Sequence, residues 1–177
     1  MSIQIFILSK LMNEDNYPYN IKKLLSEPVP LDKMRAITES KLYYHFDSLA
    51  KQGLIEIVKV IKEVHRPDKQ VYRITEKGRL ELPKKIYKVF EDADTINDMI
   101  LGIANLNYVN PDKVIEIIEK KIIEARELQE TRARLEILIN NDKDHRYNRF
   151  LSNYFYESIQ SNIYWLEKLL SDLKKDN

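Results

Sequence analysis

Residues 38–52, TESKLYYHFDSLAKQ, combine hydroxyl, ammonium and phenol groups within one short stretch. Lysine supplies a positive charge, and serine and tyrosine hydroxyls donate hydrogen bonds to phosphate oxygens or to base edges. The residues of this kind that lie closest together are Ser40, Lys41, Tyr43 and Tyr44. Their chemistry is non-covalent recognition of a polyanion, which requires an element that holds them on one surface.

The same stretch has the apolar spacing of an α-helix. The apolar residues at i, i+4 and i+7 are Leu42, Phe46 and Leu49. Thr38 is suited to cap the start of this helix, and Gly53 to end it in a left-handed conformation. With the apolar side against a core, the hydroxyl and lysine side chains face outward. Two other interpretations stay open: the tyrosine pair packs in the core or against a neighbouring element, and Lys41 is an ordinary solvated lysine.

Two helices and a hairpin are predicted around this helix. Residues 3–12 favour a buried helix, and Pro18 is well placed to begin a second one. Residues 54–64 and 71–75 favour two strands because they are rich in β-branched and aromatic residues. The turn between them carries three basic residues, His65, Arg66 and Lys69, either as DNA backbone contacts or as a plain soluble turn. The order helix, helix, helix, hairpin predicts a winged helix-turn-helix, in which the third helix enters the major groove.

The second half of the chain favours helices. Thr75 can cap a helix in which Pro83 marks a kink or a restart, and the acidic run at 91–98 is expected to be a solvated connector. Residues 112–139 and 148–174 form two long helices whose apolar stripes exceed what a small domain buries. The stripe residues expected to need a partner surface are Ile122, Leu128, Leu135 and Leu166.

The predicted fold is therefore mainly α with a small β-hairpin, with a winged helix-turn-helix domain at 1–82 and a helical dimerisation domain at 83–177. The charge distribution agrees with this division. Residues 1–80 carry 14 Lys and Arg against 10 Asp and Glu, whereas residues 81–177 carry 15 against 18. A basic first part suits a module that binds a polyanion.

Several other functions are not supported by the sequence. There are no cysteines, and the histidines have no metal-ligand spacing, so neither a metal nor a cofactor is expected. Glycine-rich phosphate loops and nucleophile motifs are absent, which argues against an enzyme. No apolar run is long enough to cross a bilayer, and the opening residues lack a signal peptide's pattern, so we expect a cytoplasmic protein.

Three segments resemble successive signatures of the PadR transcriptional regulators: NYPYNIKKLL, SKLYYHFDSLAKQGLIE and RPDKQVYRITEKG. The first matches through Tyr17, Tyr19 and Ile21; the second through Leu42, Tyr43, Gly53, Leu54 and Ile55; the third through Tyr72, Arg73, Thr75 and Gly78. Pro18 stands where the family usually has glycine, and Tyr44 where it usually has proline. The resemblance covers residues 3–80 specifically and the second half only loosely.

The resemblance implies a homodimer joined by its C-terminal helices, each protomer offering one DNA-binding head to a double-stranded operator. We expect a repressor whose operator affinity is modulated by a small aromatic ligand. The residues expected to contact DNA are Tyr19, Thr38, Ser40, Lys41, Tyr43, Tyr44, His65, Arg66 and Lys69. Trp165 belongs either to the dimer core or to the wall of a ligand pocket. The alternative function is a winged-helix module that binds protein and not DNA.

Overall fold

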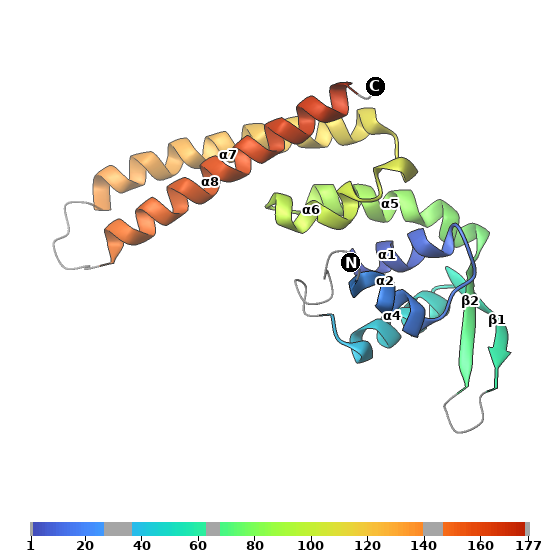
Figure 1. The fold of residues 1–177 in the computed structure, drawn as a ribbon. Helices are drawn as coiled ribbons and strands as arrows, with labels where there is room; N and C mark the ends of the chain where they lie inside the picture. Colours follow the sequence, from blue (N-terminus) through green and yellow to red (C-terminus); the bar gives the residue numbers. More distant parts are fainter. Residues whose placement is uncertain (1, 27–36, 63–67, 140–146, 176–177) are drawn as a thin grey trace. The chain divides into compact units, whose positions relative to one another are not determined.

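The computed structural model describes residues 2–26, 37–62, 68–139 and 147–175 (Figure 1). The chain divides into two compact units, of which the first comprises residues 1–89 and 101–109 and the second residues 90–100 and 110–177. Within the described ranges, the structure contains no helix with the length and apolar character of a membrane span.

Three helices form the core of the first unit. Helix α1 spans Ser2–Leu11, α2 spans Pro18–Ser26 and α4 spans Glu39–Lys51, so the three helices predicted in this region are confirmed. Helix α4 contacts both α1 and α2. The side chains with 0% exposure include Ile5, Leu8, Ile21, Phe46 and Leu49, which places the apolar stripe of α4 in this core.

A two-stranded antiparallel hairpin follows α4. Strand β1 spans Ile55–Ile61 and β2 spans Lys69–Ile74, so both strands were predicted but with somewhat different ends. The register shifts between Ile57 and Lys59, which pair with Tyr72 and Val71 respectively. This β-bulge explains why the sequence of β1 does not alternate regularly, because the extra residue reverses the order of the faces.

Helix α5 spans Glu76–Asp92 without interruption. Pro83 lies inside it, so the restart predicted at this proline is wrong, and the alternative of a kink there stays a prediction. Thr75 begins the helix as predicted, because its hydroxyl accepts a hydrogen bond from the Gly78 amide at 3.1 Å. Helix α6 spans Ile96–Ile103, and a short 3₁₀ helix, η1, spans Leu106–Tyr108.

The second unit is dominated by two long helices, α7 at Pro111–Ile139 and α8 at Asn148–Lys175, which lie side by side (Figure 1). Val114, Ile118 and Ile122 of α7 are buried, as are Ile163, Leu166 and Leu173 of α8. Two ion pairs join the exposed edges of the helices, Lys174 with Glu119 at 2.7 Å and Arg126 with Glu167. Helices of nearly equal length thus share one apolar seam.

The segment 91–98 is more ordered than a solvated connector. The Asn162 side chain of α8 accepts a hydrogen bond from the Ile96 amide at 3.1 Å and donates one to the Asp94 carbonyl at 2.9 Å. Thr95 donates a hydrogen bond to Asp98 at 2.8 Å in the first turn of α6. Asn162 therefore fixes the start of α6 onto α8. The segment is thus held by hydrogen bonds to α8, which the prediction of a solvated connector did not include.

Candidate nucleic-acid interface

The start of α4 is capped as predicted. Thr38 is extended, with φ −81° and ψ 161°, and its hydroxyl accepts a hydrogen bond from the Lys41 amide at 3.3 Å. Lys22 of α2 forms an ion pair with Glu39 at 2.7 Å, which connects this end of α4 to the preceding helix. The partly positive amino end of the helix therefore has both a side-chain cap and an acidic residue in its first turn.

The outer face of α4 is exposed to solvent. Ser40 and Lys41 are exposed, and Tyr43 and Tyr44 have exposed fractions of 45% and 69%. Tyr19 of α2 is 62% exposed. Both tyrosines of the pair are therefore outside the core, which removes the interpretation that they pack in it. We call Ser40, Lys41, Tyr43 and Tyr44 the outer face of α4.

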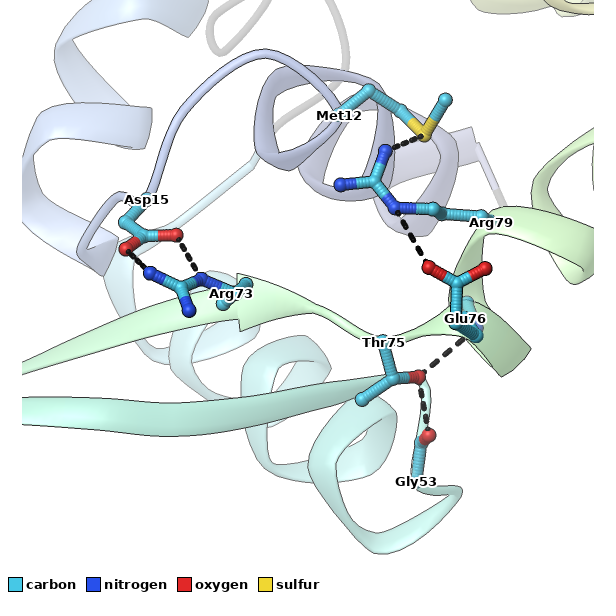
Figure 2. Close-up of polar contacts among 8 residues, drawn as sticks. Met12, Asp15, Gly53, Arg73, Thr75, Glu76 and Arg79 are labelled. Carbon is cyan, nitrogen blue, oxygen red and sulfur yellow. Dashed lines mark hydrogen bonds and ion pairs between the residues drawn. The ribbon is translucent and has the colours of Figure 1, made fainter.

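The other end of α4 closes in a Schellman motif. Gly53 has φ +69°, its amide donates to the Ala50 carbonyl at 2.9 Å, and the Leu54 amide donates to the Leu49 carbonyl at 2.9 Å. The Thr75 hydroxyl donates a hydrogen bond to the Gly53 carbonyl at 2.8 Å while it caps α5 (Figure 2). One side chain therefore ties the end of α4 to the start of α5.

His45 occupies an unusual position on α4. It is half-buried, its ring meets that of Tyr44 edge-on at 5.5 Å, and its buried Nδ1 atom has no hydrogen-bond partner. Desolvation lowers the pKa of His45, because the charged imidazolium loses water that no other group replaces. The neutral ring is thus favoured in the fold.

The hairpin forms the wing, and only part of the predicted basic tip can be described. His65 and Arg66 lie outside the described residues. Lys69 begins β2 and is not part of the turn; its ammonium lies 5.5 Å from the centre of the Tyr17 ring. Burial raises the pKa of the Tyr72 phenol, whose ring packs on Phe46 of α4 at 4.9 Å. The wing is therefore in contact with Tyr17, the residue before α2, and with Phe46 of α4.

The segment before α2 pairs with the wing, which the sequence did not predict. Asn16 and Tyr72 exchange backbone hydrogen bonds of 3.0 and 2.8 Å, forming a one-residue bridge beside β2. Next to it, Arg73 donates two hydrogen bonds to the Asp15 carboxylate at 2.8 and 2.6 Å (Figure 2). This pair lowers the pKa of Asp15 and raises that of Arg73.

The residues assigned to dimerisation differ in burial. Ile122 and Leu166 have exposed fractions of 6% and 1% within one chain, so they need no partner to leave solvent. The prediction that these two residues need a partner surface is therefore wrong. Leu128 is 48% exposed and fits the expectation, and the side chain of Leu135 lies outside the described ones. Further exposed apolar residues on α8 are Phe150, Leu151, Tyr154, Phe155 and Trp165.

Trp165 lines an open hollow of about 580 Å³ in the second unit. Its other lining residues include Ile96, Ile100, Tyr154 and Asn162. The Trp165 side chain is 49% exposed and meets the Tyr164 ring edge-on at 5.3 Å. Trp165 thus borders a mixed aromatic and polar surface and is not a core residue of the single chain.

One family of known proteins matches the first half of the sequence. The sequence matches the Transcriptional regulator PadR-like family over residues 7–84. A comparison with curated proteins gave no match. Among solved structures, PadR of Bacillus subtilis in complex with operator DNA is 15% identical, with 98% of this chain and 99% of that chain covered and a TM-score of 0.45.

Two further structures are similar. PadR of B. subtilis in complex with p-coumaric acid is 14% identical over 98% of this chain and 99% of that chain, with a TM-score of 0.42. A transcriptional regulator from Clostridium thermocellum is 30% identical over 48% of this chain and 79% of that chain, with a TM-score of 0.39. The family match covers the end of α1, all of α2, α4 and the wing, and the first half of α5. Residues 7–84 therefore form a domain of the PadR-like family, whose members are transcriptional regulators and not enzymes.

Proposed function

We propose that the protein is a dimeric repressor that inserts the outer face of α4 into the major groove of an operator. The observation that carries this proposal is the arrangement of α4, whose apolar side is buried while Tyr43 and Tyr44 are 45% and 69% exposed. Large tyrosines left in water on a helix that is capped at both ends suit a surface that becomes covered on binding.

We assign the two proposed roles to the two halves of the chain. Residues 1–82 bind DNA and residues 83–177 form the dimerisation and effector domain. On the DNA-binding side, Ser40, Lys41 and Tyr43 reach bases and phosphates, and Tyr19 and Thr38 contact the backbone. On the wing, the proposed contacts with adjacent phosphates come from His65, Arg66 and Lys69.

The first experiment is selection of genomic fragments bound by the purified protein, followed by sequencing. It gives the operator and the regulated gene together. Affinity for the recovered duplex is then measured as a function of salt. Binding that depends on phosphate contacts weakens by orders of magnitude between about 50 and 200 mM salt. Repression is tested by transcription in vitro from the promoter that carries the recovered site. Activation of that promoter would contradict the assignment as a repressor.

The role of α4 is tested with Lys41→Ala, which removes one charge from its outer face. We expect weaker operator binding and a salt slope smaller by about 0.9, the effect of losing one phosphate contact. Tyr43→Ala is expected to weaken binding with a smaller effect on the slope. Lys120→Ala removes the same charge from an exposed site on α7 and serves as the control. Equal footprints from Lys41→Ala, Tyr43→Ala and the control would contradict the assignment.

A ligand site is proposed at the hollow beside Trp165, where Tyr154 and Ile100 supply flat and apolar walls. A small aromatic molecule bound there would change the geometry of the C-terminal helices and so the spacing of the two heads. Trp165 is the chain's single tryptophan, so its fluorescence reports directly on this hollow. Titration with a panel of flat phenolic compounds should quench it for a true effector, and the same compound should lower operator affinity.

One observation favours a second function, docking of a protein on the wing. Ile57, Val58 and Val60 of β1 are 48%, 38% and 49% exposed, which is more apolar surface than a phosphate-binding wing requires. A partner held by these residues would bind with little dependence on salt. Binding that persists unchanged at high salt, together with indifference to every duplex, would support this function over DNA binding.

A further inference from the structure

The wing is attached to the rest of its unit by contacts outside the hairpin. A two-stranded hairpin is marginally stable by itself, so its direction depends on what it leans against. On the outer side of β2 lies the segment 15–17, which leads into α2. Three consecutive residues of this segment meet β2: Asp15 with Arg73, Asn16 with Tyr72, and Tyr17 with Lys69.

The pair nearest the base of the wing is the most directional of the three. Arg73 Nε lies 2.8 Å from one Asp15 oxygen and its Nη2 atom 2.6 Å from the other, so the guanidinium is held in a plane by both bonds. Glu56 lies opposite Arg73 on β1, which offers the guanidinium a second carboxylate across the hairpin. The arginine is nevertheless bound to the α1–α2 turn and not to its own hairpin.

We infer that Asp15 and Arg73 are positioning residues that set the angle at which the wing approaches DNA. This inference rests on the proposed function. Arg73 lies about 13 Å from Lys69 along an extended strand. A tilt of about 10° at Arg73 therefore displaces Lys69 by about 2 Å, which is enough to break a hydrogen bond to a phosphate.

A positioning role for Asp15 and a simple effect of net charge predict opposite changes in DNA affinity when Asp15 is removed. Asp15 is an acidic residue in the basic unit, so its removal should strengthen DNA binding if only net charge matters. If Arg73 itself binds phosphate, removing Asp15 should free it and strengthen binding further. If the pair positions the wing, Asp15→Ala should weaken binding although it makes the protein more positive.

The test measures affinity for the duplex recovered with the wild-type protein. We expect Asp15→Ala to weaken binding about fivefold and to reduce the salt slope, because wing contacts with phosphates are lost. Asp68→Ala removes an equal charge from an exposed residue beside β2 and should bind as tightly as wild type or more tightly. In a double-mutant cycle, Arg73→Gln should add little to Asp15→Ala. Tighter binding by Asp15→Ala, or additive effects, would overturn the inference.

Two further measurements separate positioning from loss of folding and from failure of the proposed function. Arg73→Lys keeps the charge but cannot make both bonds, so it should weaken binding at an unchanged melting temperature; full affinity would count against the inference. Hydrogen exchange at the Asn16 and Tyr72 amides needs no DNA. It should accelerate in Asp15→Ala, even if the wild-type protein binds no duplex, and unchanged exchange would refute the attachment itself.

Discussion

Gly78 illustrates how a single side chain can be excluded by a neighbouring backbone. A Cβ atom built at Gly78 would lie 2.1 Å from the Leu54 carbonyl oxygen and 2.7 Å from Ile74 Cγ1. Gly53, by contrast, has nothing within 4 Å of a Cβ atom, and its requirement for glycine comes from its φ of +69°. The two glycines of this region are therefore needed for different physical reasons.

The two substitutions should differ accordingly. Gly78→Ala is expected to lower the free energy of unfolding by about 3 kcal/mol, because α5 must move away from the Leu54 carbonyl. Gly53→Ala should cost about 1 kcal/mol, the penalty for a left-handed residue with a side chain. Urea denaturation monitored by circular dichroism measures both. A smaller loss for Gly78→Ala than for Gly53→Ala would contradict the close approach.

We expect His45 to make the free energy of unfolding depend on pH. Its pKa is lowered by desolvation, so the unfolded chain binds this proton more readily than the folded one. Unfolding free energy should therefore fall as the pH decreases below the unfolded value of about 6.5. His45→Phe should reduce the loss of stability between pH 7 and pH 5, measured by urea denaturation at each pH. An identical pH dependence in both proteins would show that other groups cause it.

At the scale of elements, α4 is held at both ends by groups that also begin or end other elements. Lys22 ties its first turn to α2, and Thr75 ties its last turn to α5. Phe46 meets the Tyr72 ring of the wing. The helix proposed to enter the groove is thus fixed relative to its neighbours, which limits the entropy lost on binding DNA.

Thr75→Val tests the connection between α4 and α5. The variant keeps the shape of the side chain but loses the hydrogen bond to the Gly53 carbonyl and the cap on the Gly78 amide. We expect the free energy of unfolding to fall by about 1–2 kcal/mol. Thr75→Ser keeps the hydroxyl and should lose much less. Chemical denaturation compares the pair, and equal losses would mean that the methyl group, not the hydroxyl, matters.

At the scale of the whole molecule, the exposed apolar residues of α7 and α8 are the basis for the proposed dimer. Leu128 is 48% exposed, and Phe150 and Tyr154 are 67% and 58% exposed. This is a large apolar surface for one chain to leave in water. A second copy of the chain would cover it, which is why we propose a dimer joined through these helices.

Leu128→Asp tests this arrangement. An unpaired carboxylate in an apolar interface costs several kcal/mol, so the variant should sediment as a monomer at concentrations where the wild-type protein is a dimer. Leu80→Asp, at a residue of α5 that is 70% exposed, is the matched control and should leave the dimer intact. A dimer that survives Leu128→Asp would place the interface elsewhere.

The local elements could be predicted from the sequence because their causes are local. Helical spacing placed Leu42, Phe46 and Leu49 on the inner side of α4, and the caps at Thr38 and Gly53 needed only their nearest neighbours. The hairpin could also be predicted from the sequence, whereas its β-bulge could not. The outer face of α4, and hence the candidate site, followed from the same periodicity.

Contacts between distant residues could not be read in this way. Asp15 and Arg73 are 58 positions apart, and Asn162 meets the Asp94 carbonyl across 68 positions. The burial of Ile122 and Leu166 within one chain depends likewise on how α7 and α8 pack. Periodicity reports which side of an element is apolar, but it carries no information about which neighbour covers that side. That choice is made by packing, when segments far apart in the chain are brought together.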